Sequence, residues 1–244
     1  MKSLTAFSSQ GARPFQEDFV LAHWERGIFA VADGFGGPGA GPEAARLACE
    51  SVQSFLEKEA GDLEATLPFV LKSYYSLAGN VLFNSILHAN QRLVRLNRGK
   101  SVNERGGASL LAGYLDGSLL ALANVGACSG WLFRDGGLTE LVRPRTYSRL
   151  SDPWAEDTQR DTPLMAVGMV ADLEPEIIEV QTRGGDWLLL QTDGIGPQMR
   201  ERLRELQGAA AGSAESLALS AREATGLLKE GQYQDNAAAV LVGF

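Results

Sequence analysis

The sequence predicts an α+β fold in which helices cover the faces of antiparallel sheets. Short apolar runs separated by turn signals such as Asp116-Gly117 and Asp135-Gly136 are typical of antiparallel strands joined by tight turns. Two pairs of segments instead carry apolar residues at intervals of three and four, the spacing of one helix face. Strands, a helix pair, a run of strands, a second helix pair and a final strand follow in that order. We therefore expect helices layered on sheets rather than a doubly wound arrangement.

The apolar runs and helical stripes place the elements along the chain. The expected strands are residues 4–8, 19–24, 27–33, 108–114, 119–125, 131–133, 176–182, 187–192 and 237–244. The first helix is expected to begin between Pro38 and Pro42, because proline is favoured in a first helical turn. The other expected helices are 67–96, 198–206 and 214–229. The polar, proline-containing segment 143–161 indicates a loop or flap that covers a site.

Composition limits the classes of function. A chain of 244 residues with 45% apolar content can build a large core, and nothing in it marks a domain boundary. Lys and Arg number 22 against 30 Asp and Glu, a net charge of −8, so we expect no nucleic-acid partner. Cys49 and Cys128 stand in unrelated contexts. They indicate a reducing compartment and neither a disulfide framework nor a thiolate zinc site.

No targeting segment stands out in the sequence. The apolar stretch after Lys2 is too short for a signal-peptide core, and no segment reaches the roughly 18 consecutive apolar residues of a membrane helix. We therefore expect a cytoplasmic protein with no membrane insertion.

Three aspartates, Asp33, Asp193 and Asp235, each lie in a turn beside an expected strand. If these strand ends meet, the carboxylates repel one another unless cations bind or their pKa values rise. With only His23 and His88 as histidines, a metal would be held by oxygen ligands, which suit Mg²⁺ or Mn²⁺. The alternative is that each is an ordinary turn aspartate, and spacing alone does not decide between the two.

Six short motifs follow one another along the chain: Gly11-x-Arg13-x-x-x-Glu17-Asp18, VADGFGG at 31–37, GGAS at 106–109, ANVG at 123–126, QTDGI at 191–195 and Asp235-Asn236. Each is weak alone. Together, in this order and spacing, they resemble the metal-dependent Ser/Thr protein phosphatases of type 2C, and most of all the compact bacterial members of that family. The resemblance runs essentially from end to end.

The resemblance implies a four-layer αββα sandwich of two antiparallel sheets flanked by pairs of antiparallel helices, with residues 1–244 as a single catalytic domain. It implies phosphoserine and phosphothreonine hydrolysis by a hydroxide that bridges two Mn²⁺ or Mg²⁺ ions. The implied partner is a phosphorylated protein, whose phosphorylation a Ser/Thr kinase would supply, and the implied state is a monomer. Substrate choice is expected to lie in segment 143–161.

The family positions fall on particular residues of this sequence. The implied metal residues are Asp18, Asp33, Gly34 through its carbonyl, Asp193 and Asp235. Arg13 matches the phosphate-binding arginine, and Arg13, Asp33 and Asp193 are the implied catalytic residues. Glu17 and Asn236 are expected to support the metal site from outside its ligand shell.

The chain also departs from the family pattern. Ala127 replaces the aspartate associated with a third metal, which argues against a third ion, and Phe35 stands where many members have a histidine. Cys128 is expected to be inert packing rather than a nucleophile. Because the two-metal residues are intact, we expect an active enzyme. The alternatives are a pseudophosphatase that binds phosphoproteins without turnover, and hydrolysis of small phosphoesters at the same centre.

Overall fold

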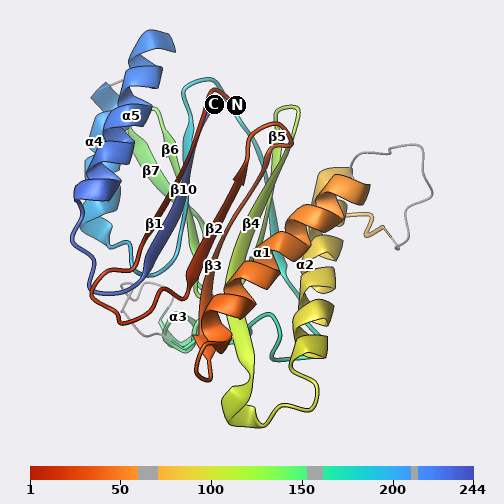
Figure 1. Cartoon of the computed structure of the whole chain (residues 1–244). Helices are drawn as coiled ribbons and strands as arrows, with labels where there is room; N and C mark the ends of the chain where they lie inside the picture. Colours follow the sequence, from red (N-terminus) through yellow and green to blue (C-terminus); the bar gives the residue numbers. More distant parts are fainter. Residues whose placement is uncertain (60–70, 153–161, 210–213) are drawn as a thin grey trace.

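The computed structural model describes residues 1–59, 71–152, 162–209 and 214–244. Two antiparallel five-stranded sheets pack face to face, and a helix pair lies outside each of them (Figure 1). The expected four-layer α+β sandwich is confirmed.

The elements fall into four sets. The first sheet has the order β1 (Ser3–Ser9), β10 (Ala237–Gly243), β9 (Trp187–Gln191), β6 (Ser129–Arg134) and β7 (Gly137–Val142). The second has the order β2 (Asp18–His23), β3 (Ile28–Gly36), β4 (Gly106–Asp116), β5 (Leu119–Val125) and β8 (Glu176–Gln181). The long helices are α1 (Ala40–Glu59) and α2 (Leu77–Leu96) on the second sheet, with α4 (Pro197–Ala209) and α5 (Ala214–Glu230) on the first. Two short helices complete the set, a 3₁₀ turn (Val102–Glu104) and α3 (Tyr147–Ser151).

Strand β3 shows how the alternation of side chains builds this core. Phe29 and Val31 belong to the apolar layer between the sheets, whereas Ala30 and Ala32 pack in the cluster that includes the helices α1 and α2. All four side chains are fully buried, which explains why the strand reads as one continuous apolar run. The core therefore fixes β3 on both faces and holds Asp33, three residues before the end of the strand, in a defined place.

Three details differ from the sequence-based expectation. Strand β7 had not been predicted, and α3 lies inside the segment that had been expected to be a loop. Helix α2 begins only at Leu77, where the Ser76 hydroxyl accepts a hydrogen bond from the Gly79 N–H (3.1 Å). Residues 67–70 of the expected helix and 153–161 of the expected flap lie outside the described residues.

None of the helices in the described ranges combines the length and the apolar character that crossing a bilayer requires.

Candidate metal centre

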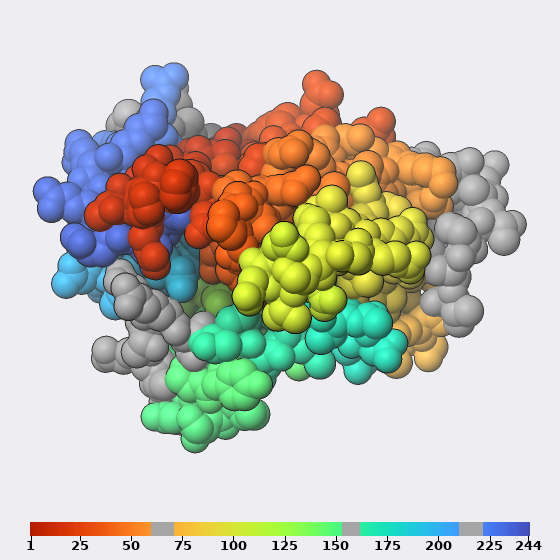
Figure 2. Space-filling view, turned by 60° about the horizontal axis from the view of Figure 1, so that its bottom comes forward, coloured from red at the N-terminus to blue at the C-terminus, as the bar shows by residue number. Residues whose placement is uncertain are grey.

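One pocket of about 490 Å³ opens at the end of the sandwich that lies at the bottom of Figure 1. Every residue that the sequence predicted for the site lines this pocket: Arg13, Glu17, Asp18, Asp33, Gly34, Asp193, Asp235 and Asn236. Figure 2 turns this end toward the viewer, with the orange start of α1, the yellow end of α2 and the teal segment after residue 162 next to one another. The structure thus brings together residues that lie more than 200 positions apart in the sequence.

Four strand ends supply the aspartates. Asp18 begins β2 and lies directly opposite Asp33 on β3 in the antiparallel register. Asp193 follows β9 and Asp235 precedes β10, and these two strands are neighbours in the other sheet. The pocket therefore takes two carboxylates from each sheet, and its shape depends on how the sheets pack.

Burial and mutual repulsion act on these carboxylates together. Asp18 is only 6% exposed, and its pKa rises to about 7, chiefly because burial disfavours its charge. The pKa of Asp33 rises well above its ordinary value for the same reason and because Asp18 is close by. Burial also raises the pKa of Glu17. A divalent cation in the pocket would oppose these shifts, since it favours the charged carboxylates.

Two glycines let the backbone approach closely around the site. A Cβ at Gly34 would lie 2.1 Å from the Gly41 carbonyl oxygen, at the start of α1. Gly11 has a φ of +60°, and a Cβ there would lie 2.1 Å from the Asp235 carbonyl oxygen. Any larger residue at either position would push apart the segments that carry the aspartates.

The loop that carries Arg13 is fixed by Asn236. The Asn236 side-chain amide donates to the carbonyl oxygens of Gln10 and Phe15 (2.8 Å each), and its Oδ1 accepts from the Glu17 N–H (2.9 Å). Arg13 itself is 41% exposed at the side chain and donates from Nη2 to Asp235 Oδ2 (2.5 Å). This hydrogen bond, together with the charge of Asp235, raises the pKa of the Arg13 guanidinium.

The donor set fits a hard divalent cation in kind, because carboxylate and carbonyl oxygens are the ligands that Mg²⁺ and Mn²⁺ prefer. In the described ranges, however, no three His, Cys, Asp or Glu side chains form a group arranged to hold a metal ion. The ion pair with Arg13 engages one carboxylate, Asp235.

Sequence reasoning missed two parts of this site. The buried Thr192 hydroxyl donates to Asp18 Oδ2 (2.7 Å) and accepts from the Ala238 N–H (2.9 Å), which ties the two sheets together. Its position directly before Asp193 was the available signal. Residues 162–166, 169 and 170 also line the pocket, whereas the flap had been expected to end at 161.

The burial of the Cys128 thiol agrees with the expectation that this residue packs in the core and does not react. Burial raises its pKa well above the ordinary range, so the thiolate that a nucleophile needs is disfavoured.

Comparison with known proteins gives a consistent result. A family model described as protein phosphatase 2C matches residues 11–230. The serine/threonine protein phosphatase PstP of Mycobacterium tuberculosis is 28% identical over 191 residues, which cover 75% of this chain and 34% of PstP. The chain thus spans about a third of the length of that curated relative.

Solved structures share the fold. The crystal structure of M. tuberculosis PstP/Ppp superposes with a TM-score of 0.74 at 23% identity, covering 99% of this chain and 98% of that one. PppA, a regulatory component of T6SS in Pseudomonas aeruginosa, gives 0.72 at 23% identity, covering 99% and 97%. The PstP catalytic domain in complex with two manganese ions gives 0.71 at 23% identity, covering 98% and 96%.

Proposed function

Because the chain belongs to the protein phosphatase 2C family, we propose that residues 1–244 form one catalytic domain that hydrolyses phosphoserine and phosphothreonine in proteins with the help of Mn²⁺ or Mg²⁺. The observation that supports this most is the convergence of four aspartates and Arg13 on one pocket. Such a cluster is stable at neutral pH only with cations bound or with protons retained.

The residues that would hold two ions are Asp18, Asp33, Asp193 and Asp235, with the Gly34 carbonyl oxygen. When bound, the ions would lower the pKa of a water, so that hydroxide is available at neutral pH to attack phosphorus, and they would neutralise charge on the phosphoryl oxygens. Ala127 offers no carboxylate, so we propose no third ion.

Arg13 would bind the phosphate of the substrate. Its guanidinium presents several N–H donors in a planar fork that matches phosphate oxygens, and it is exposed at the pocket mouth. The hydrogen bonds of Asn236 hold the Arg13 loop in place, and Glu17 lines the pocket beside it. Phe35 lines the same pocket and brings no proton donor, so protonation of the leaving alkoxide falls to solvent.

The proposed substrate class follows from the relatives. PstP is named a serine/threonine protein phosphatase, and this chain resembles about a third of its length. We therefore propose a phosphorylated protein as partner, with a Ser/Thr kinase supplying the phosphate that this chain removes.

One observation favours a second candidate, a pseudophosphatase that binds phosphoproteins without turnover. The Arg13 ion pair engages Asp235, and a chain that kept this pair in the presence of metal would bind the metal and the phosphate less readily. The two candidates differ in turnover, because only the phosphatase would release phosphate when a divalent ion is present.

The test is hydrolysis of p-nitrophenyl phosphate and of a phosphothreonine peptide, with EDTA, Mg²⁺ or Mn²⁺. We expect turnover that needs a divalent ion and falls by orders of magnitude in Asp193→Asn. The matched control is Asp116→Asn, a substitution of the same type at an exposed position in the β4–β5 turn. A folded protein without activity under any metal would favour the pseudophosphatase, and an Asp193→Asn variant at the wild-type rate would remove Asp193 from the site.

A further inference from the structure

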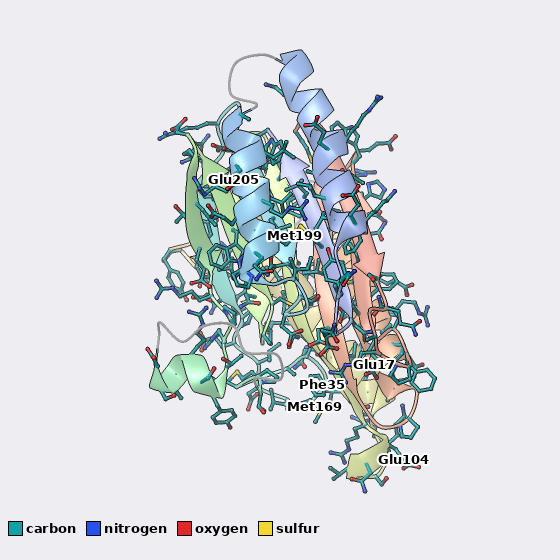
Figure 3. All side chains as sticks on the ribbon, turned by 90° about the vertical axis from the view of Figure 1, so that its left-hand side faces the viewer. Glu17, Phe35, Glu104, Met169, Met199 and Glu205 are labelled. Carbon is teal, nitrogen blue, oxygen red and sulfur yellow. The ribbon has the colours of Figure 1, made fainter. Side chains whose placement is uncertain are left out.

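The pocket has an acidic part and an apolar part. Besides the aspartates, Phe35, Leu164, Met165, Met169 and Val170 line it. Phe35 and Met169 lie next to each other at the same end of the molecule as Glu17 (Figure 3). A Cβ on Gly107 would lie 2.7 Å from the Met169 side chain and 2.9 Å from the Phe35 ring, so the two side chains close over this glycine. Phe35 and Met169 therefore form an apolar surface in the same pocket as the carboxylates.

The backbone behind this surface, which we call the strap (residues 162–170), is held by buried hydrogen bonds. Val167 and Ala108 of β4 exchange two backbone hydrogen bonds (2.9 and 3.0 Å). The Gly168 N–H donates to Asn90 Oδ1 (2.8 Å), and the Asn97 amide donates to the Gly168 carbonyl oxygen (2.9 Å). Asn90 and Asn97 are themselves buried on α2 and at its end. The strap thus presents its side chains from a rigid support.

Its two methionines remain partly open to solvent. Met165 is 36% exposed and Met169 is 45% exposed, although both line a pocket on a well-anchored backbone. Apolar side chains that stay exposed inside a pocket offer surface that a ligand can bury. Methionine suits that role because its flexible thioether adapts to apolar partners of different shape.

We propose that the strap is a specificity surface that accepts an apolar side chain next to the phosphorylated residue of a peptide substrate. This rests on the proposed phosphatase function and narrows its substrate class to phosphoserine or phosphothreonine flanked by apolar residues. The pocket volume of about 490 Å³ lies in the range of pockets that hold whole small ligands, so it has room for more than a phosphate group.

Polar neighbours are disfavoured for a physical reason. An amide or charged side chain placed on the two methionines loses water without gaining a hydrogen-bond partner there. A leucine in the same place gains from burial of its apolar surface.

The test measures binding, so that it does not depend on turnover. Two fluorescent peptides carry a non-hydrolysable phosphonate mimic of phosphothreonine, flanked on both sides by leucine in one peptide and by glutamine in the other. Their affinities are measured by anisotropy with Mn²⁺ present. We expect the wild-type protein to bind the leucine peptide about fivefold more tightly, the ratio that burial of part of one leucine side chain supports.

The double variant Met165→Gln/Met169→Gln keeps the length of both side chains and removes their apolar character, so the preference should fall to near unity. Leu71→Gln, at an exposed residue that precedes α2 and does not line the pocket, is the matched control and should keep the wild-type preference. Equal binding of the two peptides by the wild type, no binding of either, or an unchanged preference in the double variant would overturn the proposal.

A second measurement uses the wild-type protein alone and covers the case in which the double variant fails to fold. Mild peroxide oxidises exposed methionines, and mass spectrometry reads each site. The leucine peptide should protect Met165 and Met169 more than the glutamine peptide does, whereas the buried Met199 should react slowly throughout. Equal protection by both peptides would overturn the proposal.

Parallel assays with the true phosphothreonine peptides separate the two proposals. Selective binding without phosphate release would refute the phosphatase function and leave the strap's preference standing. Release of phosphate at equal kcat/KM from both peptides, with equal binding, would refute only the strap's preference.

Discussion

Replacing Thr192 by valine tests whether a buried hydroxyl supports the aspartate cluster. Valine keeps the shape of the fully buried side chain and removes its hydroxyl. The Ala238 N–H then loses its acceptor (2.9 Å), and Asp18 loses a donor (2.7 Å). A buried donor without a partner costs about 1–3 kcal/mol, and a hydrogen bond to a charged group contributes about 1.5–3 kcal/mol. Because the two effects overlap, we expect a loss of about 2–4 kcal/mol in the free energy of unfolding at pH 8.

Urea unfolding in EDTA measures this loss without contributions from metal binding. The control is Thr182→Val, which removes a hydroxyl that donates to the Ser118 carbonyl oxygen near the surface (2.9 Å) and should change stability by less than about 0.5 kcal/mol. A loss below about 1 kcal/mol for Thr192→Val would show that the hydroxyl does not carry the contact between the sheets.

Three further predictions follow from the same pocket. Arg13→Ala should raise KM for phosphopeptides, while turnover of p-nitrophenyl phosphate should remain detectable. An unchanged KM for phosphopeptides would exclude Arg13 from phosphate binding. Gly34→Ala should abolish Mn²⁺ binding in calorimetry, because its Cβ would meet the Gly41 carbonyl oxygen at 2.1 Å, and wild-type affinity would contradict the close approach. The folded pKa of Asp18, about 7, lies above the unfolded value of about 3.9, so the stability it contributes is present below about pH 4 and is lost as pH rises through about 7. Thermal unfolding in EDTA should show this fall. Asp18→Asn should make the fall shallower without removing it, because the raised pKa of Asp33 acts in the same direction. A wild-type profile identical to that of Asp18→Asn would refute the contribution of Asp18.

Sequence reasoning worked where one local pattern decides the outcome. The apolar run before Asp33 specifies a strand buried on both faces, although the strand continues past Asp33 to Gly36 rather than ending at the carboxylate. An apolar run likewise specifies the strand before Asp193. The layered fold followed from the order of such elements, and the structure confirms it.

Sequence reasoning failed where the deciding contact joins segments that lie far apart in the sequence. The hydrogen bond between Thr192 and Asp18 spans 174 positions and the pair of Arg13 with Asp235 spans 222, and no local pattern encodes either. The strap has no periodicity because its backbone bonds go to Asn90, Asn97 and β4 rather than to a regular ladder. Strand β7 was missed because it is short and only its last residue, Val142, is buried.

The division of the pocket between two sheets links metal binding to the stability of the whole sandwich. Asp18 and Asp33 are carried by one sheet, and Asp193 and Asp235 flank strands of the other, so without cations any repulsion between charged forms of these carboxylates acts between the two sheets. The apolar layer that opposes this force includes Val31 on one sheet and Leu188 on the other, both fully buried. A cation bound by carboxylates from both sheets would turn the repulsion into a bridge, so Mn²⁺ should raise the thermal midpoint of the entire domain rather than order the pocket alone. Hydrogen exchange can distinguish the two, because a bridge between the sheets slows exchange along β3 and β9 far from the pocket, whereas local ordering slows it only near the aspartates.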